Sequence, residues 1–189
     1  MRFGLLFWRD QRGGISFEFT IVFPLLMALL ISSFGFFNAF RAADQHAKVS
    51  YVINDMVSRD EEVTDADLAE IALLQRKMLP DSMSGLGLRI SSICFAGGSH
   101  KVMWSYTNND ADGPAWRALK NDEVPAGILP GMQEQENVIL TETTAYWAPP
   151  ISSFWVGPRS LASELVIRPR LVQMLIWKGQ NESNVCPST

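Results

Sequence analysis

The chain has 189 residues, of which 47% are hydrophobic and 19% are charged, and its formal net charge is −4. This length suits one domain, or a smaller domain with an appendage, and the hydrophobicity excludes a disordered chain. The acidic balance, without a run of Lys or Arg, argues against nucleic acid as a partner. Two cysteines are too few for a disulfide-scaffolded miniprotein or a four-cysteine zinc site.

The N-terminal region contains an apolar run from Phe19 to Phe37 without a single charge. An α-helix rises about 1.5 Å per residue and the hydrocarbon core of a bilayer is about 30 Å thick, so about 20 such residues span it. The leader 1–13 before the run carries three arginines against one aspartate, which favours a cytoplasmic N-terminus and a periplasmic remainder. A cleaved signal peptide is the competing interpretation, but its apolar region is usually about 7–15 residues long. We therefore expect a single-pass transmembrane helix over residues 14–40.

Glu18 stands directly before this apolar run, and Gly13 and Gly14 stand before Glu18. A carboxylate near bilayer depth is costly and usually has a partner or a function. The order of basic leader, glycine, four residues, glutamate and long hydrophobic helix resembles the processing site of type IV prepilins. The resemblance implies that a prepilin peptidase cuts between Gly13 and Gly14 and leaves the helix attached. The new α-amine could then be neutralised by Glu18 of a neighbouring subunit.

Residues 12–26 read RGGISFEFTIVFPLL. They resemble the N-terminus of TadE-like minor pseudopilins of the tight-adherence (Tad, or Flp) pilus system, which typically show R-G-x-x-x-x-E-F-A-x-x-x-P-L-L. Glu18, Phe19 and Pro24 fit this pattern and are the assembly contacts that the resemblance implies, whereas Thr20 replaces the usual alanine. The close match is confined to this run, and the rest of the chain is similar to the family only in layout.

The resemblance implies a minor pseudopilin of a Tad-type pilus, anchored in the bacterial inner membrane. Its partners would be the prepilin peptidase, other Tad pilins and pseudopilins, and the inner-membrane assembly platform. The alternative is an unprocessed, signal-anchored periplasmic domain of another envelope or secretion machine. Ala28, Ser32 and Gly35 lie near one face of the expected helix and would allow close approach of a second helix.

The residues beyond the leader (1–13) and the transmembrane helix (14–40) are expected to form a periplasmic head domain over 41–189. A stripe of helical period predicts that the first helix continues past the membrane: Val49, Val52, Ile53, Met56, Val57. The charged run 58–62 should interrupt it. A second helix is expected over 64–79, capped by Thr64 or Asp65 and stopped by Pro80 and the pair Gly85/Gly87.

Beyond residue 86 the apolar period becomes two, which predicts strands over 88–95 and 101–107 around a turn at Gly97-Gly98. A longer strand is expected over 138–147. Residues 164–168 and 171–177 should form a last pair or one strand kinked at Pro169. Two helices followed by an antiparallel β-meander give an α+β fold class.

No constellation for catalysis is visible, so we expect neither an enzyme nor a cofactor. The two histidines, His46 and His100, are expected on the surface. The loop Asn108–Gly113 resembles the opening of a calcium loop, but the position of the bidentate glutamate holds Leu119, and an Asx-rich turn explains the loop equally well. Trp155 is the candidate for an exposed contact, and the remaining tryptophans beyond the span are expected to pack: Trp104, Trp116, Trp147, Trp177.

Cys94 and Cys186 both fall on the expected periplasmic side, where thiols tend to oxidise. A disulfide between them would close a loop of about 90 residues and add roughly 4–5 kcal/mol of stability in the chain-entropy treatment. Two independent thiols, with Cys94 buried in a strand and Cys186 in a frayed tail, are the alternative.

Overall fold

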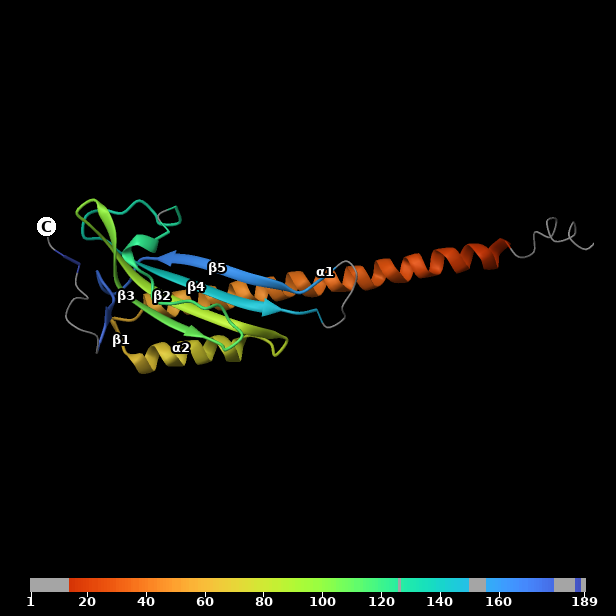
Figure 1. Ribbon diagram of the computed structural model, residues 1–189, viewed down its shortest axis with the longest axis horizontal. Helices are drawn as coiled ribbons and strands as arrows, with labels where there is room; N and C mark the ends of the chain where they lie inside the picture. Colours follow the sequence, from red (N-terminus) through yellow and green to blue (C-terminus); the bar gives the residue numbers. More distant parts are fainter. Residues whose placement is uncertain (1–13, 126, 150–155, 179–185, 188–189) are drawn as a thin grey trace, which may run out of the picture.

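The computed structural model describes residues 14–125, 127–149, 156–178 and 186–187. A long N-terminal helix leads into a head made of a second helix and an antiparallel four-stranded sheet, as Figure 1 shows, so the predicted α+β class is confirmed. The elements in chain order are α1 (Gly14–Ser58), β1 (Glu62–Val63), α2 (Asp65–Met78), β2 (Met83–Ala96), β3 (Ser99–Asn109), η3 (Asn121–Glu123), β4 (Asn137–Trp147), β5 (Arg159–Ile167) and β6 (Ile176–Trp177).

The first helix, α1, is continuous over 45 residues and passes through Pro24 without ending. Its first half projects away from the head, and its second half lies against the sheet (Figure 1). There it contacts β4 and β5. The predicted continuation of the helix past the apolar segment is therefore confirmed.

The predicted apolar stripe of α1 is only partly the buried face. Val49, Ile53 and Val57 are buried, but Val52 is 38% exposed and Met56 is 42% exposed. Val52 and Met56 are exposed because the sheet lies against the side of the helix that also carries small and polar residues. Ala42, Ser50 and others take the place of the two exposed side chains in that contact.

The sheet has the strand order β3-β2-β4-β5, with all neighbours antiparallel. This order departs from that of a simple meander, because β4 pairs with β2 rather than with β3. Nearly every residue of β2 and β4 is buried, whereas β3 and β5 are largely half-exposed. The two central strands, β2 and β4, are the ones covered on both faces. The long connection between β3 and β4 gives the chain enough length to cross to the other side of β2.

Glycines form the hairpin between β2 and β3 as predicted. Gly97 and Gly98 have φ values of +61° and +73°. A two-residue turn with both central residues at positive φ matches the twist of the flanking strands, and glycine adopts it without strain. The pair Gly85/Gly87, in contrast, lies inside β2 and does not stop α2, which ends at Met78.

The helices cover one face of the sheet, and the connection 110–136 covers the other. The helical face holds the larger core, including Leu88, Ile90 and Ile139. On the opposite face Leu119, with partly buried side chains of the connection, packs against Ile93 and Leu140. The head is therefore a layered structure with the sheet in its middle.

The C-terminal region differs from the prediction. Only Ile176 and Trp177 of the expected strand 171–177 are extended, and they pair in parallel with Glu62–Val63 rather than with the sheet. The indole nitrogen of Trp177 donates to Asp65 at 2.7 Å, and that of Trp104 donates to the Leu175 carbonyl at 2.8 Å. These two bonds hold the segment beside the α1–α2 connection and β3, rather than as a strand of the four-stranded sheet.

Candidate membrane anchor and assembly site

One helix of the described chain, α1, is long and apolar enough to cross a membrane. Its most apolar 18-residue window has a mean hydropathy of 2.2, and only 6% of that window is buried inside the molecule. The core helix of a soluble domain would be mostly buried, whereas this segment exposes large apolar side chains. By length and composition, the segment is able to span a lipid bilayer.

Three residues of the prepilin-like pattern lie on the bare part of α1. Glu18 is exposed, and Phe19 is 64% exposed and stacks on Phe23 with 5.3 Å between ring centroids. Pro24 lies within the helix one turn further on. Gly14 is the first helical residue, and Gly13 lies outside the described residues. The pattern therefore places a carboxylate within the first two turns of an uncovered helix.

Two polar side chains on the apolar part of α1 form hydrogen bonds within the helix. The Ser32 hydroxyl donates to the Ala28 carbonyl at 2.7 Å, and the Asn38 amide donates to the Phe34 carbonyl at 2.8 Å. Bonds of this kind remove the cost of placing a hydroxyl or an amide in lipid. Ala28 and Ser32, the predicted small-residue pair, have short side chains that extend little from one side of the helix.

A buried polar seam joins α1 to the sheet. We use this name for His46, Ser50 and Asn54 on the helix and Thr141 and Thr143 on β4. Ser50 Oγ and Thr143 Oγ1 are 2.6 Å apart, and the Thr141 hydroxyl donates to the Asn54 side-chain oxygen at 3.0 Å. All five side chains are at most 5% exposed. The second half of α1 therefore contacts the head through hydrogen bonds as well as through apolar side chains.

His46 lies in this seam and is 3% exposed, so the prediction that it is a surface residue was wrong. Its Nε2 atom has no hydrogen-bond partner among the described residues. Burial lowers the pKa of His46 below its usual value, because the protonated ring would lose its hydration. His46, Ser50 and Asn54 are spaced four residues apart, which places them on one face of the helix. The pattern of apolar residues does not reveal this face.

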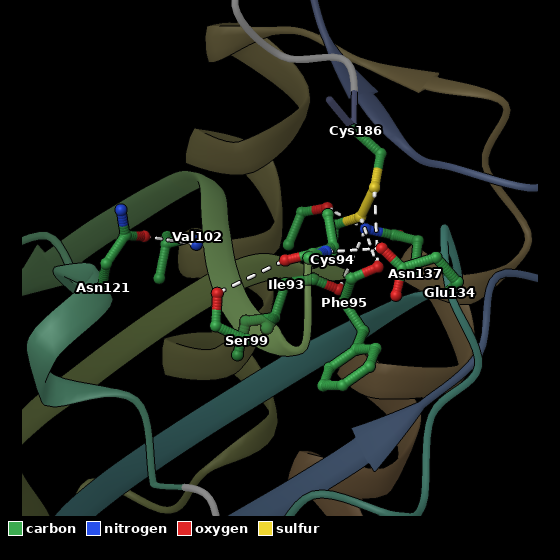
Figure 2. Close-up of a disulfide and its surroundings, with 12 residues drawn as sticks. Ile93, Cys94, Phe95, Ser99, Val102, Asn121, Glu134, Asn137 and Cys186 are labelled. Carbon is green, nitrogen blue, oxygen red and sulfur yellow. Dashed lines mark hydrogen bonds between the residues drawn. A yellow bond between two sulfur atoms is a disulfide. The ribbon is translucent and has the colours of Figure 1, made fainter. Parts of the chain in front are cut away.

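Cys94 and Cys186 are joined by a disulfide in the structure, with their Cα atoms 5.9 Å apart (Figure 2). The bond closes 92 residues of sequence at the end of β2. Nearby, the Gln135 amide donates to the Phe95 carbonyl at 2.8 Å and the Asn137 amide donates to Ser92 Oγ at 2.8 Å. The sequence favoured this pairing, and the fold brings both cysteines to the same end of the sheet.

The calcium-like loop Asn108–Gly113 is stabilised by the protein itself. Asp110 accepts hydrogen bonds from Arg76 and from the Leu86 amide, and the Asp110 carbonyl accepts one from Gly113. Among the described residues, no group of three or more His, Cys, Asp or Glu side chains could hold a metal ion. Residues Asp110–Gly113 thus form a hydrogen-bonded turn in which the Asp110 side chain is occupied by contacts within the protein.

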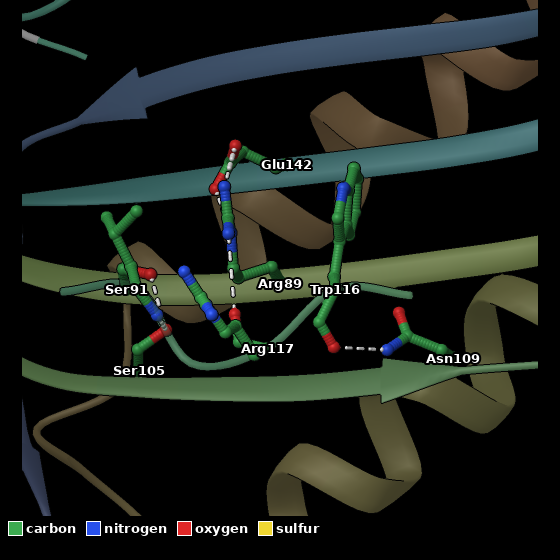
Figure 3. Close-up of polar contacts among 8 residues, drawn as sticks. Arg89, Ser91, Ser105, Asn109, Trp116, Arg117 and Glu142 are labelled. Atoms are coloured by element: carbon green, nitrogen blue, oxygen red, sulfur yellow. Dashed lines mark hydrogen bonds and ion pairs between the residues drawn. The ribbon is translucent and has the colours of Figure 1, made fainter. Parts of the chain in front are cut away.

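A largely buried ion pair lies on the loop-covered face of the sheet (Figure 3). Arg89 Nη2 donates to Glu142 Oε1 at 2.5 Å, and the Arg89 guanidinium lies 5.4 Å from the centroid of the Trp116 ring. Glu142 is 6% exposed, and Arg89 occupies both of its oxygens. The arrangement holds the connection 110–136 on the sheet, and both oxygens of the Glu142 carboxylate are occupied. Trp155, the expected exposed contact, lies outside the described residues.

No protein-family model, curated protein or solved structure matches this chain.

Proposed function

We propose that this protein is a minor pseudopilin, or assembly component, of a Tad-type pilus. It would be anchored in the bacterial inner membrane by residues 14–40, with the leader 1–13 in the cytoplasm and the head 41–189 in the periplasm. A prepilin peptidase would cut between Gly13 and Gly14. The protein would act through contacts with pilin-like subunits and the inner-membrane assembly platform, not through catalysis.

The observation that carries the proposal is the position of Glu18. It stands five residues after Gly13, at the start of a continuous helix whose first half is bare and whose second half supports a folded head. A membrane anchor alone needs no carboxylate there, and a buried charge is costly without a partner. Cleavage after Gly13 would supply that partner as the new α-amine of a neighbouring subunit.

Mass spectrometry of the protein purified from membranes of the source bacterium tests the proposal. We expect the mature chain to begin at Gly14. The leader carries three arginines and one aspartate, a net charge of +2, so the mature chain would have a net charge of −6 instead of −4. Loss of the leader is therefore visible both in mass and in isoelectric point.

A bulky residue at the cleavage site provides the control. Gly13→Phe should keep the leader while membrane insertion persists, and Gly4→Phe, which lies elsewhere in the leader, should be cleaved normally. A full-length chain of unchanged size in cells with and without the peptidase would contradict the proposal. That result would favour the unprocessed, signal-anchored domain.

A further inference from the structure

A groove of about 690 Å³ lies between α1 and α2 on the helical side of the head. Met56 of α1 and Ile71, Leu73 and Leu74 of α2 supply its apolar lining. Met56 is 42% exposed and Leu73 is 50% exposed. Val52, one helical turn before Met56, is 38% exposed and extends the apolar surface along α1. Large apolar side chains gathered in a groove with a polar rim are typical of an interaction site.

The rim of this groove is acidic. It carries four carboxylates and one basic side chain: Asp60, Glu62, Asp67, Glu70, Lys77. Glu62 pairs with Lys178, and Asp67 is bonded to Thr64 at the start of α2. Asp60 and Glu70 form no ion pair within the part of the chain that the structure describes. Partial burial, and then the charge of Asp67, raise the pKa of Asp60.

We propose that the groove binds a cationic amphipathic helix of a partner protein. Apolar residues of that helix, spaced i, i+3, i+4 and i+7, would contact Met56, Leu73 and Leu74, as in other helix-in-groove complexes. Its Lys or Arg side chains would face Asp60 and Glu70. Each of these two carboxylates would thereby gain an ion pair, and complementary charge would select the partner.

The position of the groove separates this partner from the lipid surface. Met56 lies sixteen residues beyond Phe40, which is about 24 Å along a helix that rises about 1.5 Å per residue. Anionic headgroups would also be repelled by the acidic rim. The inference concerns the head and does not rest on leader cleavage or on pilus assembly, so it can fail or succeed independently of the proposed function.

The test measures peptide binding to the full-length protein in phosphatidylcholine nanodiscs, with empty nanodiscs subtracted. The probe is a helical peptide of about 14 residues with Leu at the four stated positions and Lys at flanking positions. Its counterpart carries Glu in place of Lys. We expect saturable binding of the Lys peptide with a Kd of about 1–100 μM, weakening as salt increases, and at least about tenfold weaker binding of the Glu peptide.

Matched variants locate the binding surface. Glu70→Lys and Met56→Gln should each weaken binding of the Lys peptide about tenfold or more. Asp122→Lys makes the same charge change as Glu70→Lys, but outside the groove. Ile128→Gln removes an apolar side chain outside the groove that is 41% exposed, close to the 42% of Met56. Both controls should bind as the parent protein does.

Three results would overturn the inference. The first is absence of binding above empty nanodiscs. The second is a loss of specificity, seen either as equal affinity for the Lys and Glu peptides or as unchanged affinity in both groove variants. The third is concentration-dependent self-association that Glu70→Lys and Met56→Gln abolish. That last result would assign the groove to a second copy of this chain.

Discussion

Glu18 is the residue at which an assembly role and a merely structural role predict different outcomes. An exposed acid near a helix N-terminus contributes only about 0.3–1 kcal/mol through the helix dipole. A carboxylate paired with a neighbour's α-amine in a low-dielectric bundle has a larger effect, because breaking a buried pair costs on the order of 3–5 kcal/mol. These magnitudes differ enough for one substitution to separate them.

We predict that Glu18→Gln and Glu18→Ala leave membrane insertion and leader cleavage intact, since Gly13 is unchanged. Piliation and crosslinking to other pilin-like subunits should decrease sharply. Immunoblots of membrane fractions measure insertion, cleavage and crosslinking, and electron microscopy of the cells measures piliation. Normal pili with Glu18→Ala would reduce this residue to a helix-terminal acid, and failed cleavage would make it part of the peptidase recognition site instead.

At the scale of elements, we expect the contact between α1 and β4 to respond to pH. The buried polar seam places His46 where neither solvent nor a described side chain satisfies its Nε2 atom. Burial lowers its pKa in the folded protein relative to about 6.5 in the unfolded chain. As the pH decreases through about 6.5, the unfolded chain takes up a proton before the folded protein does. The free energy of unfolding should therefore decrease on acidification and be constant for this group above about pH 7.5.

The prediction is tested by urea unfolding of the full chain in detergent between about pH 7.5 and 5.5. The parent protein should lose stability towards the acidic end. His46→Gln, which carries no titrating group, should show a flatter profile, whereas His100→Gln at the β2–β3 hairpin should keep the slope of the parent. Equal slopes in the parent and in His46→Gln would show that another group causes the pH dependence.

At the scale of the whole molecule, the disulfide between Cys94 and Cys186 connects the C-terminal end of the chain to the end of the central strand β2. A covalent link over 92 residues restricts the unfolded chain more than a short loop would. The parallel pairing of β6 with β1 brings the C-terminal segment to the α1–α2 connection as well. Together these links join the end of the chain to the sheet and to the connection between the two helices.

We predict that Cys94→Ser and Cys186→Ser each lower the free energy of unfolding by up to about 4–5 kcal/mol. The double substitution should cost no more than either single one, because all three remove the same bond. Non-reducing gels of alkylated protein should show a compact species that migrates more slowly after reduction. Labelling of both cysteines by a thiol reagent in the native protein would contradict the prediction.

The sequence by itself determined the features that depend on local composition and spacing. The charge-free run after Glu18 predicts an apolar helix able to span a membrane, because this prediction depends only on the length and hydropathy of the run. Thr64 predicts the start of α2 because a capping side chain acts within one turn, and the structure shows its reciprocal bonds with Asp67. The glycine pair at 97–98 predicts the hairpin for the same local reason.

Only the tertiary structure decided which surfaces meet. His46 is buried, and Val52 and Met56 are exposed, because the rotation of α1 against β4 and β5 selects the covered face. β4 pairs with β2 rather than with β3 because the most buried strands occupy the centre of the sheet, and a chain pattern does not encode that order. The groove between α1 and α2 likewise arises from residues that are distant in sequence and become neighbours only when both helices pack on the sheet.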